Sequence, residues 1–356
     1  MIRKPFLIVL FVGSTALLWQ SCGKKEDNPE EKPTTRYACD GTLAQCLKIK
    51  SGWTFEGRIS DEIMIDPSAV KLPDGRFRIY ANSSSSSATR TVISLISADG
   101  LNYTLEHGAR IVGDSNHDAF FPDVIVLPNG QFRIYLTDQR THIGDQGAPA
   151  FISAISDNGL DFVWEPGERL HYSGTGDEAG GIRNPCVILL ANGTYRMYYA
   201  GLLGTGPKAA KVLSAASTDG LTWNRESGVR WDPANLCPAA TNSGVNPKVF
   251  LDHTGIYHMF NAAAACDDMN HTNEAIGIFE GTSQDGLSFN FSRTAVVQGY
   301  YIKSQYHGNP EDPFVNPEDP MIILTPAGFR MYFNCPQSGA ATSDARYHSI
   351  VNPNLN

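Results

Sequence analysis

One phrase occurs five times along the chain and restricts the fold more than any other feature. Each copy contains a proline, an apolar strand, a turn centred on glycine and a second strand rich in aromatic residues. The copies read DPSAVKLPDGRFRIYA from Asp66, FPDVIVLPNGQFRIYL from Phe121, NPCVILLANGTYRMYYA from Asn184, NPKVFLDHTGIYHMFN from Asn246 and DPMIILTPAGFRMYFN from Asp319. Asp-Gly and Asn-Gly are typical of tight hairpin turns, because these residues tolerate positive φ. The phrase therefore predicts five similar β-hairpins.

A second phrase stands after each of the first four hairpins and marks the turn between a third and a fourth strand. The copies read SADGLNY from Ser97, SDNGLDF from Ser156, STDGLTW from Ser217 and SQDGLSF from Ser283. The fifth unit lacks this phrase, whereas Gly52-Trp53-Thr54-Phe55-Glu56 stands alone before the first unit. We therefore predict an all-β fold, a five-bladed β-propeller with four-stranded blades, whose last blade is closed by an N-terminal strand. A β-sandwich of similar strands is the alternative, and five matched copies argue against it.

Polar residues gather around the aligned prolines. The inner strand of each propeller blade starts beside the central axis, so these side chains are expected to converge. The set consists of Asp66, Asp118, Asp123, Arg183, Asn184, Asn246, Glu318 and Asp319. Cleavage of a glycosidic bond needs one protonated and one ionised carboxyl group. Clustered carboxylates also raise the pKa of one of their number, which prepares an acid at neutral pH.

The repeated phrases resemble those of the five-bladed glycoside hydrolases, especially family 43 and its relatives in families 32, 62 and 117. The resemblance extends from about Trp53 to Ile350. It implies that Asp66, in Asp-Pro-Ser, is the general base and that Asp123, in Phe-Pro-Asp-Val, positions and tunes the acid. Family 43 has its acid glutamate two residues before the third-blade proline, where this chain has Arg183.

The departure at Arg183 leaves the identity of the acid open. Glu318 and Glu178 are the two catalytic alternatives, and His307 is a third residue able to give a proton. Arg183 suits an anionic sugar, a pair of ring hydroxyls or the neutralisation of Asp123. We expect the remaining polar residues to bind substrate, namely Asp118, Arg183, Asn184, Asn246, His307 and Asp319.

Three functions are compatible with these features. The resemblance implies a glycoside hydrolase acting on plant or algal polysaccharide or oligosaccharide, similar to arabinofuranosidases or xylosidases and inverting. A non-catalytic glycan-binding surface lipoprotein on the same fold is the second hypothesis, and a structural or protein-docking propeller is the third. No cofactor is required, although a calcium ion would suit the carboxylates. A net charge of −9 without a basic run argues against a nucleic-acid partner.

The N-terminus has the pattern of an export signal. Residues 1–21 read as a lipoprotein signal peptide, because Arg3 and Lys4 precede an apolar run that is short for a membrane-spanning helix. The run ends at Ser21-Cys22-Gly23, which resembles a bacterial lipobox and implies lipidation of Cys22. Residues 22–37 read as a flexible charged tether, similar to those of surface-exported Bacteroidetes lipoproteins, and residues 38–356 as the propeller domain. We expect a lipid-anchored protein at the outer membrane or cell surface.

The other cysteines and two histidines carry smaller expectations. Disulfides are permitted in an exported chain, and the expected pairs are Cys39 with Cys46 and Cys237 with Cys266. Cys186 and Cys335 lie in strand-like runs and are expected to be buried thiols. His253 and His258 flank a predicted strand pair and are expected to point outward.

Overall fold

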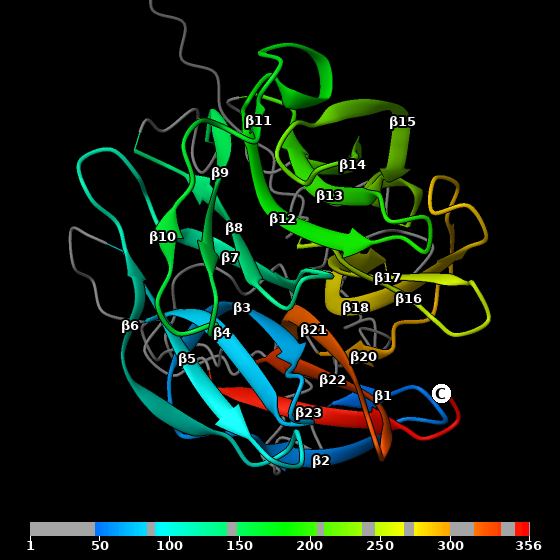
Figure 1. The fold of residues 1–356 in the computed structure, drawn as a ribbon. Coiled ribbons are helices and arrows are strands. Elements are labelled where there is room, and N and C mark those ends of the chain that lie inside the picture. The colour runs from blue at the N-terminus through cyan, green and yellow to red at the C-terminus, as the bar shows by residue number, and fades with distance from the viewer. Residues whose placement is uncertain are drawn as a thin grey trace, which may run out of the picture. The chain divides into compact units, whose positions relative to one another are not determined.

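The computed structural model describes residues 47–83, 90–140, 148–204, 210–236, 246–266, 274–299, 317–335 and 346–355. Five antiparallel sheets form the blades of a β-propeller (Figure 1). Blade 1 contains β3 (Met64–Lys71), β4 (Phe77–Ser83), β5 (Thr91–Ser97) and β6 (Thr104–Val112). Blade 2 contains β7 (Phe120–Val126), β8 (Phe132–Asp138), β9 (Ala150–Ser156) and the short outer strands β10 (Val163–Trp164) and β11 (Leu170–His171). Blade 3 contains β12 (Ile182–Leu189), β13 (Tyr195–Leu202), β14 (Ala210–Ser217) and β15 (Asn224–Trp231).

The last two blades each take a strand from the N-terminal part of the chain. Blade 4 contains β16 (Lys248–Leu251), β17 (Tyr257–Cys266), β18 (Glu274–Ser283), the short outer strands β19 (Asn290–Phe291) and β20 (Val297–Gln298), and β1 (Lys48–Ile49). Blade 5 contains β21 (Glu318–Thr325), β22 (Gly328–Asn334), β23 (Tyr347–Asn352) and β2 (Thr54–Arg58). Two short 3-10 helices, η1 (Gly176–Glu178) and η2 (Pro233–Asn235), complete the described elements. The inner strands β3, β7, β12, β16 and β21 contact one another in a closed circle.

The predicted fold and its closure are confirmed. The five blades share four strand positions, the outer position of blades 2 and 4 is divided between two short strands, and β1 adds a further edge strand to blade 4. β2 pairs with β23 through Thr54 and Val351, so the N-terminal strand closes blade 5. The sequence did not predict the pairing of β1 with β20, which joins the same N-terminal segment to blade 4.

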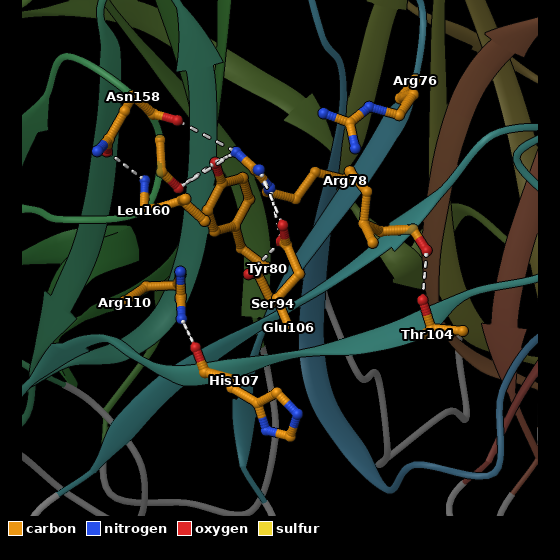
Figure 2. A network of polar contacts seen from close by, with 12 residues as sticks. Arg76, Arg78, Tyr80, Ser94, Thr104, Glu106, His107, Arg110, Asn158 and Leu160 are labelled. Carbon is orange, nitrogen blue, oxygen red and sulfur yellow. Dashed lines mark hydrogen bonds and ion pairs between the residues drawn. The ribbon is translucent and has the colours of Figure 1, made fainter.

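An arginine and a tyrosine of the second strand fasten four of the blades to the next blade. In blade 1 the Tyr80 hydroxyl donates to the Gly159 carbonyl of blade 2 at 2.8 Å, and Arg78 Nη1 donates to the Asn158 carbonyl at 3.3 Å (Figure 2). The Arg78 guanidinium also binds both carboxylate oxygens of Glu106, at 2.7 and 2.9 Å. The same contacts join Arg133 and Tyr135 to Asp219 and Gly220, Arg196 and Tyr198 to Asp285 and Gly286, and Arg330 and Tyr332 to Asp99 and Gly100. The Ser-x-Asp/Asn-Gly turn is therefore a structural joint between blades.

The junction between blades 4 and 5 lacks both elements of this joint, the arginine–tyrosine pair and the turn that accepts its hydrogen bonds. Blade 4 has His258 and Phe260 where other blades have arginine and tyrosine, and blade 5 lacks the Ser-x-Asp-Gly turn. The N-terminal segment joins the two blades instead. Trp53 packs edge-on against Phe260 with ring centroids 6.4 Å apart, and Lys50 Nζ lies 3.2 Å from Glu280 Oε2.

His258 does not point outward, so that prediction is wrong. Its ring is buried between Glu280, 3.0 Å from Nδ1, and Asp252, 3.3 Å from Nε2. His258 occupies the arginine position of the repeat, and Glu280 takes the place of the arginine's glutamate partner. His253 is exposed, as predicted.

Cys186 and Cys335 are free, buried thiols, as predicted. Cys39, Cys46 and Cys237 lie outside the described residues, as do Cys22 and residues 1–37, so the disulfide and anchoring expectations stay predictions. No helix among the described residues is long and apolar enough to cross a membrane.

Candidate functional site

The residue before the aligned proline has a left-handed backbone in four of the five blades. The φ angles are 48° at Asp66, 51° at Phe121, 52° at Asn184 and 50° at Asp319. At each of these positions the register of the first two strands shifts by a β-bulge. Such a conformation costs a non-glycine residue about 1–3 kcal/mol and is concentrated at functional sites. The bulges at the start of the inner strands therefore mark a candidate functional site.

Four of the predicted residues meet in one polar cluster. The Asn246 amide donates to Asp66 Oδ1 at 3.1 Å and to Asp319 Oδ1 at 3.0 Å. The Asn184 amide donates to Asp66 Oδ1 at 3.3 Å. Side chains from blades 1, 3, 4 and 5 are thus brought together, as the sequence predicted.

Two further side chains hold Asp319 in place. Asn334 Nδ2 lies 3.1 Å from Asp319 Oδ2, and the Tyr347 hydroxyl lies 3.4 Å from the same oxygen. Asn334 ends β22 and Tyr347 begins β23, so both lie at the same end of blade 5 as Asp319. Neither was among the predicted site residues, because both lie at the ends of strands that carry no aligned proline.

Burial raises the pKa of Asp66 well above its ordinary value, and the nearby Asp319 raises it further. Arg183, Lys248 and the hydrogen bond from Asn184 oppose this shift and do not overcome it. Burial also lowers the pKa of Arg183, against the attraction of Asp66 and Asp319. Asp66 therefore holds a proton more strongly than an exposed carboxyl group does.

Asp123 lies beside this cluster in a second buried contact set. The Val187 amide donates to Asp123 Oδ2 at 2.7 Å, and Ser68 Oγ and Lys248 Nζ lie 3.2 and 3.3 Å from Oδ1. Burial raises the pKa of Asp123, although Lys248 and these hydrogen bonds oppose the shift. Burial lowers the pKa of Lys248, but the attraction of the nearby Asp123 is stronger, so the pKa of Lys248 is raised.

Lys248 is a site residue that the sequence reasoning missed. It follows the aligned proline of blade 4 directly, the position that Asp123 occupies in blade 2. Its charge acts on Asp66 as well as on Asp123. The signal in the sequence is that the position directly after the aligned proline holds a charged residue in only two of the five repeats, Asp123 and Lys248.

Glu178 is occupied by contacts of its own blade. Its carboxylate accepts from the Tyr199 hydroxyl at 2.6 Å, from Arg225 Nε at 2.9 Å and from the Ser173 amide at 2.6 Å. Burial raises its pKa, but Arg225 and Tyr199 outweigh burial and the pKa is lowered. A general acid must hold its proton near neutral pH, so these contacts do not favour Glu178 as the acid.

The other predicted residues are placed as follows. Glu318 is half-buried in β21, directly before Asp319, and lies opposite Asn334 in the register. Asp118 forms an ion pair with Arg90, whose guanidinium lies 3.8 Å from the centre of the Phe120 ring. His307 lies outside the described residues. The described residues contain no group of three or more His, Cys, Asp or Glu side chains able to hold a metal ion.

The solved structures similar to this chain are glycoside hydrolases with the same propeller fold. A thermostable family-43 glycoside hydrolase is 15% identical over 81% of this chain and 88% of its own, with a TM-score of 0.55. An endo-arabinase from Bacteroides thetaiotaomicron is 12% identical over 84% of this chain and 97% of its own, with a TM-score of 0.57. An α-L-arabinofuranosidase from Fusarium graminearum is 12% identical over 85% of this chain and 98% of its own, with a TM-score of 0.56.

These likenesses establish the fold of the chain. No protein-family model matches the sequence, and no curated protein matches it either. The chemistry has to be argued from the residues of this chain.

Proposed function

We propose that this chain is a glycoside hydrolase acting on plant or algal polysaccharide or oligosaccharide, of the arabinofuranosidase or xylosidase kind. One observation carries the proposal: Asp66 and Asp319, from different blades, are held by a single Asn246 amide at 3.1 and 3.0 Å. Glycosidic cleavage uses one protonated and one ionised carboxyl group. The fold shared with known glycosidases supports the same conclusion.

In this pair Asp66 is the group that holds the proton. Burial and the nearby Asp319 both raise the pKa of Asp66 and so favour its protonated form. Asp319 accepts hydrogen bonds from Asn246, Asn334 and Tyr347, and we assign it as the second carboxyl group of the pair. We therefore assign Asp66 as the acid, which differs from the general base that the resemblance implies, because a base must be ionised before the step.

The spacing of the pair bears on the stereochemistry. Two oxygens at 3.1 and 3.0 Å from one nitrogen are closer together than the roughly 6.5–9.5 Å between the carboxyl groups of inverting enzymes. An inverting mechanism therefore needs a more distant carboxyl group to activate water, and Glu318 is our candidate. Without it, the pair would act with retention.

Kinetics on aryl arabinofuranosides, aryl xylosides and the matching polysaccharides test the hydrolase. Asp66→Asn and Asp319→Asn should each lower kcat by about 10²–10⁴-fold. Asp66→Asn removes the acid, and Asp319→Asn removes the charge that raises the pKa of Asp66 and, in a retaining mechanism, the nucleophile. Asp74→Asn, in an exposed hairpin turn, is the matched control and should leave kcat unchanged. A variant at Asp66 or Asp319 with wild-type kcat would refute the proposal. Glu318→Gln should lower kcat only if the mechanism inverts, which NMR of the released anomer reports.

A glycan-binding protein without catalysis is the second candidate function. It is favoured by Arg183, whose positive charge acts on both Asp66 and Asp319 and stands where family 43 has its acid. Under this alternative, sugar binding measured by calorimetry would persist while no substrate is hydrolysed. Arg183→Glu would then be expected to weaken binding without creating activity.

We also propose that the chain is exported and held at the outer membrane or cell surface by lipid on Cys22. A diacylated cysteine buries enough methylene groups to keep a protein on a bilayer. Cys22→Ala should therefore move the protein from the membrane fraction to the soluble fraction. Retention of Cys22→Ala in the membrane fraction would contradict the anchor, with Cys186→Ala as a control that leaves membrane retention unchanged.

A further inference from the structure

A cavity lies between the outer edges of blades 3 and 4, and none of its lining residues belongs to the polar cluster. Its volume is about 780 Å³. Three aromatic side chains line it, Trp231, Phe289 and Phe291, of which the two phenylalanines are half-buried. The Trp231 and Phe291 rings are tilted toward each other with centroids 5.5 Å apart. The polar residues of the lining include the exposed Ser227, Asn235, Ser288, Asn290 and Arg293, together with the buried Arg230 and the half-buried Asp232.

Trp231 departs from the repeat. The equivalent register position holds Ile111 in blade 1, Leu170 in blade 2 and Val297 in blade 4. An aliphatic residue therefore suffices to fill this layer between blades. Trp231 adds an indole N–H, which is buried and has no hydrogen-bond partner among the described residues. A buried donor without a partner is costly, so it points to a ligand group that accepts from it.

Arg293 supplies charge at the rim of the same cavity. It is exposed and has no ion-pair partner in the described part of the chain, whereas the neighbouring Asp232 is paired with Lys211 at 3.3 Å. A guanidinium presents a rigid fork of donors that matches a carboxylate. Arg230, the other arginine of the lining, is buried and donates to Ser214 and to the Leu287 and Ser227 carbonyls. The cavity thus combines aromatic faces, an indole donor, amide and hydroxyl groups, and the exposed positive charge of Arg293.

We propose that this cavity is a second, non-catalytic binding site for a carbohydrate chain that carries carboxylate groups. Sugar rings have apolar faces that pack on aromatic side chains, and hydroxyl groups that accept from an indole N–H or an amide. The carboxylate of an acidic sugar binds Arg293. Such a site would bind a polysaccharide on the side of the propeller while the polar cluster acts on another part of the same polysaccharide. It goes beyond the proposed function and does not depend on hydrolysis.

Native gel electrophoresis in polygalacturonate and in neutral arabinan tests the site, using the full chain in the Asp66→Asn background so that no substrate is consumed. Trp231→Leu installs the residue of blade 2 and should fold. We expect Trp231→Leu and Arg293→Gln each to weaken retardation by polygalacturonate at least ten-fold. Arg76→Gln, an exposed arginine on a blade 1 hairpin, makes the same charge change and should have no effect.

The outcomes separate this proposal from the proposed function. In the catalytically intact protein, Trp231→Leu and Arg293→Gln should leave kcat on small aryl glycosides unchanged, because the cavity is not part of the polar cluster. Retardation of both variants equal to that of the parent, or no retardation of the parent, would overturn the second site whatever the kinetics show. Equal retention by arabinan and polygalacturonate would overturn the assignment of a carboxylate to Arg293.

Discussion

The joint between blades allows a sharp test through Gly159. Its φ angle is 70°, and its carbonyl accepts from the Tyr80 hydroxyl of blade 1 at 2.8 Å. A Cβ atom added at Gly159 would lie 2.6 Å from Tyr80 Oη and 2.8 Å from Arg78 Nη1. Gly159→Ala must therefore displace both donors as well as strain the backbone.

The magnitude follows from these two effects. A left-handed backbone costs an alanine about 1–2 kcal/mol. Displacing a buried hydrogen bond and one to a charged donor adds roughly 1.5–3 kcal/mol. We expect Gly159→Ala to lower the free energy of unfolding by about 2.5–5 kcal/mol. Gly130→Ala is the matched control, because its φ is 88° and no atom lies within 4 Å of the added Cβ, so only the backbone effect remains.

Urea denaturation followed by tryptophan fluorescence measures both variants, with ΔG obtained by linear extrapolation. Tyr80→Phe completes a double-mutant cycle with Gly159→Ala. The two changes disrupt the same hydrogen bond, so their combined effect should fall short of additivity by about 1 kcal/mol. Equal destabilisation by Gly159→Ala and Gly130→Ala, or full additivity of Gly159→Ala with Tyr80→Phe, would refute the claim that this joint stabilises the propeller.

Three further predictions concern buried groups. The raised pKa of Asp66 means that the folded state binds more protons than the unfolded state between the ordinary and the raised value. The stability of the wild type should therefore fall as pH rises through that window, whereas the stability of Asp66→Asn should not. Parallel profiles of Tm against pH for the two proteins would contradict the raised pKa of Asp66. Asn261 is fully buried, its amide nitrogen and oxygen have no partner among the described residues, and the equivalent residue in blade 2 is Leu136. Asn261→Leu should raise stability by about 1 kcal/mol, and a lower urea midpoint would argue against the assignment. Trp53→Ala should lower the free energy of unfolding by about 3–5 kcal/mol, because it opens the junction of blades 4 and 5. Trp164→Ala, at the half-buried edge of blade 2, should lower it less. A smaller loss of stability from Trp53→Ala than from Trp164→Ala would disprove the role of the N-terminal segment.

The buried position of His258 illustrates a limit of pattern reading. Alternation along a strand tells which residues share a face, but not whether that face meets solvent or the next blade. In this repeat the arginine face is buried by the neighbouring blade in every case, so His258 is buried with it. Aligning His258 with Arg78 and Arg330 would have predicted this, because the repeat itself records which positions lie between blades.

Glu178 and Lys248 show the same limit at the candidate site. Glu178 is close in sequence to the third-blade proline, yet Arg225 from the outer strand of that blade binds it. Lys248 and Asp123 are 125 residues apart in sequence, yet Lys248 Nζ lies 3.3 Å from Asp123 Oδ1. Proximity in sequence does not determine which charges meet, because the partners come from strands distant in the chain.

The sequence by itself determined the number of blades, their hairpins, the strand that closes blade 5 and the set of polar residues beside the prolines. These features depend on local rules: turn residues that tolerate positive φ, alternation along a strand, and repetition. Only the tertiary structure decided that Asp66 and Asp319 share the Asn246 amide, that Lys248 accompanies Asp123, and that β1 fastens blade 4. The reason is physical: a pKa or an ion pair depends on burial and on charges within a few ångströms, and both arise only when separate blades are packed together.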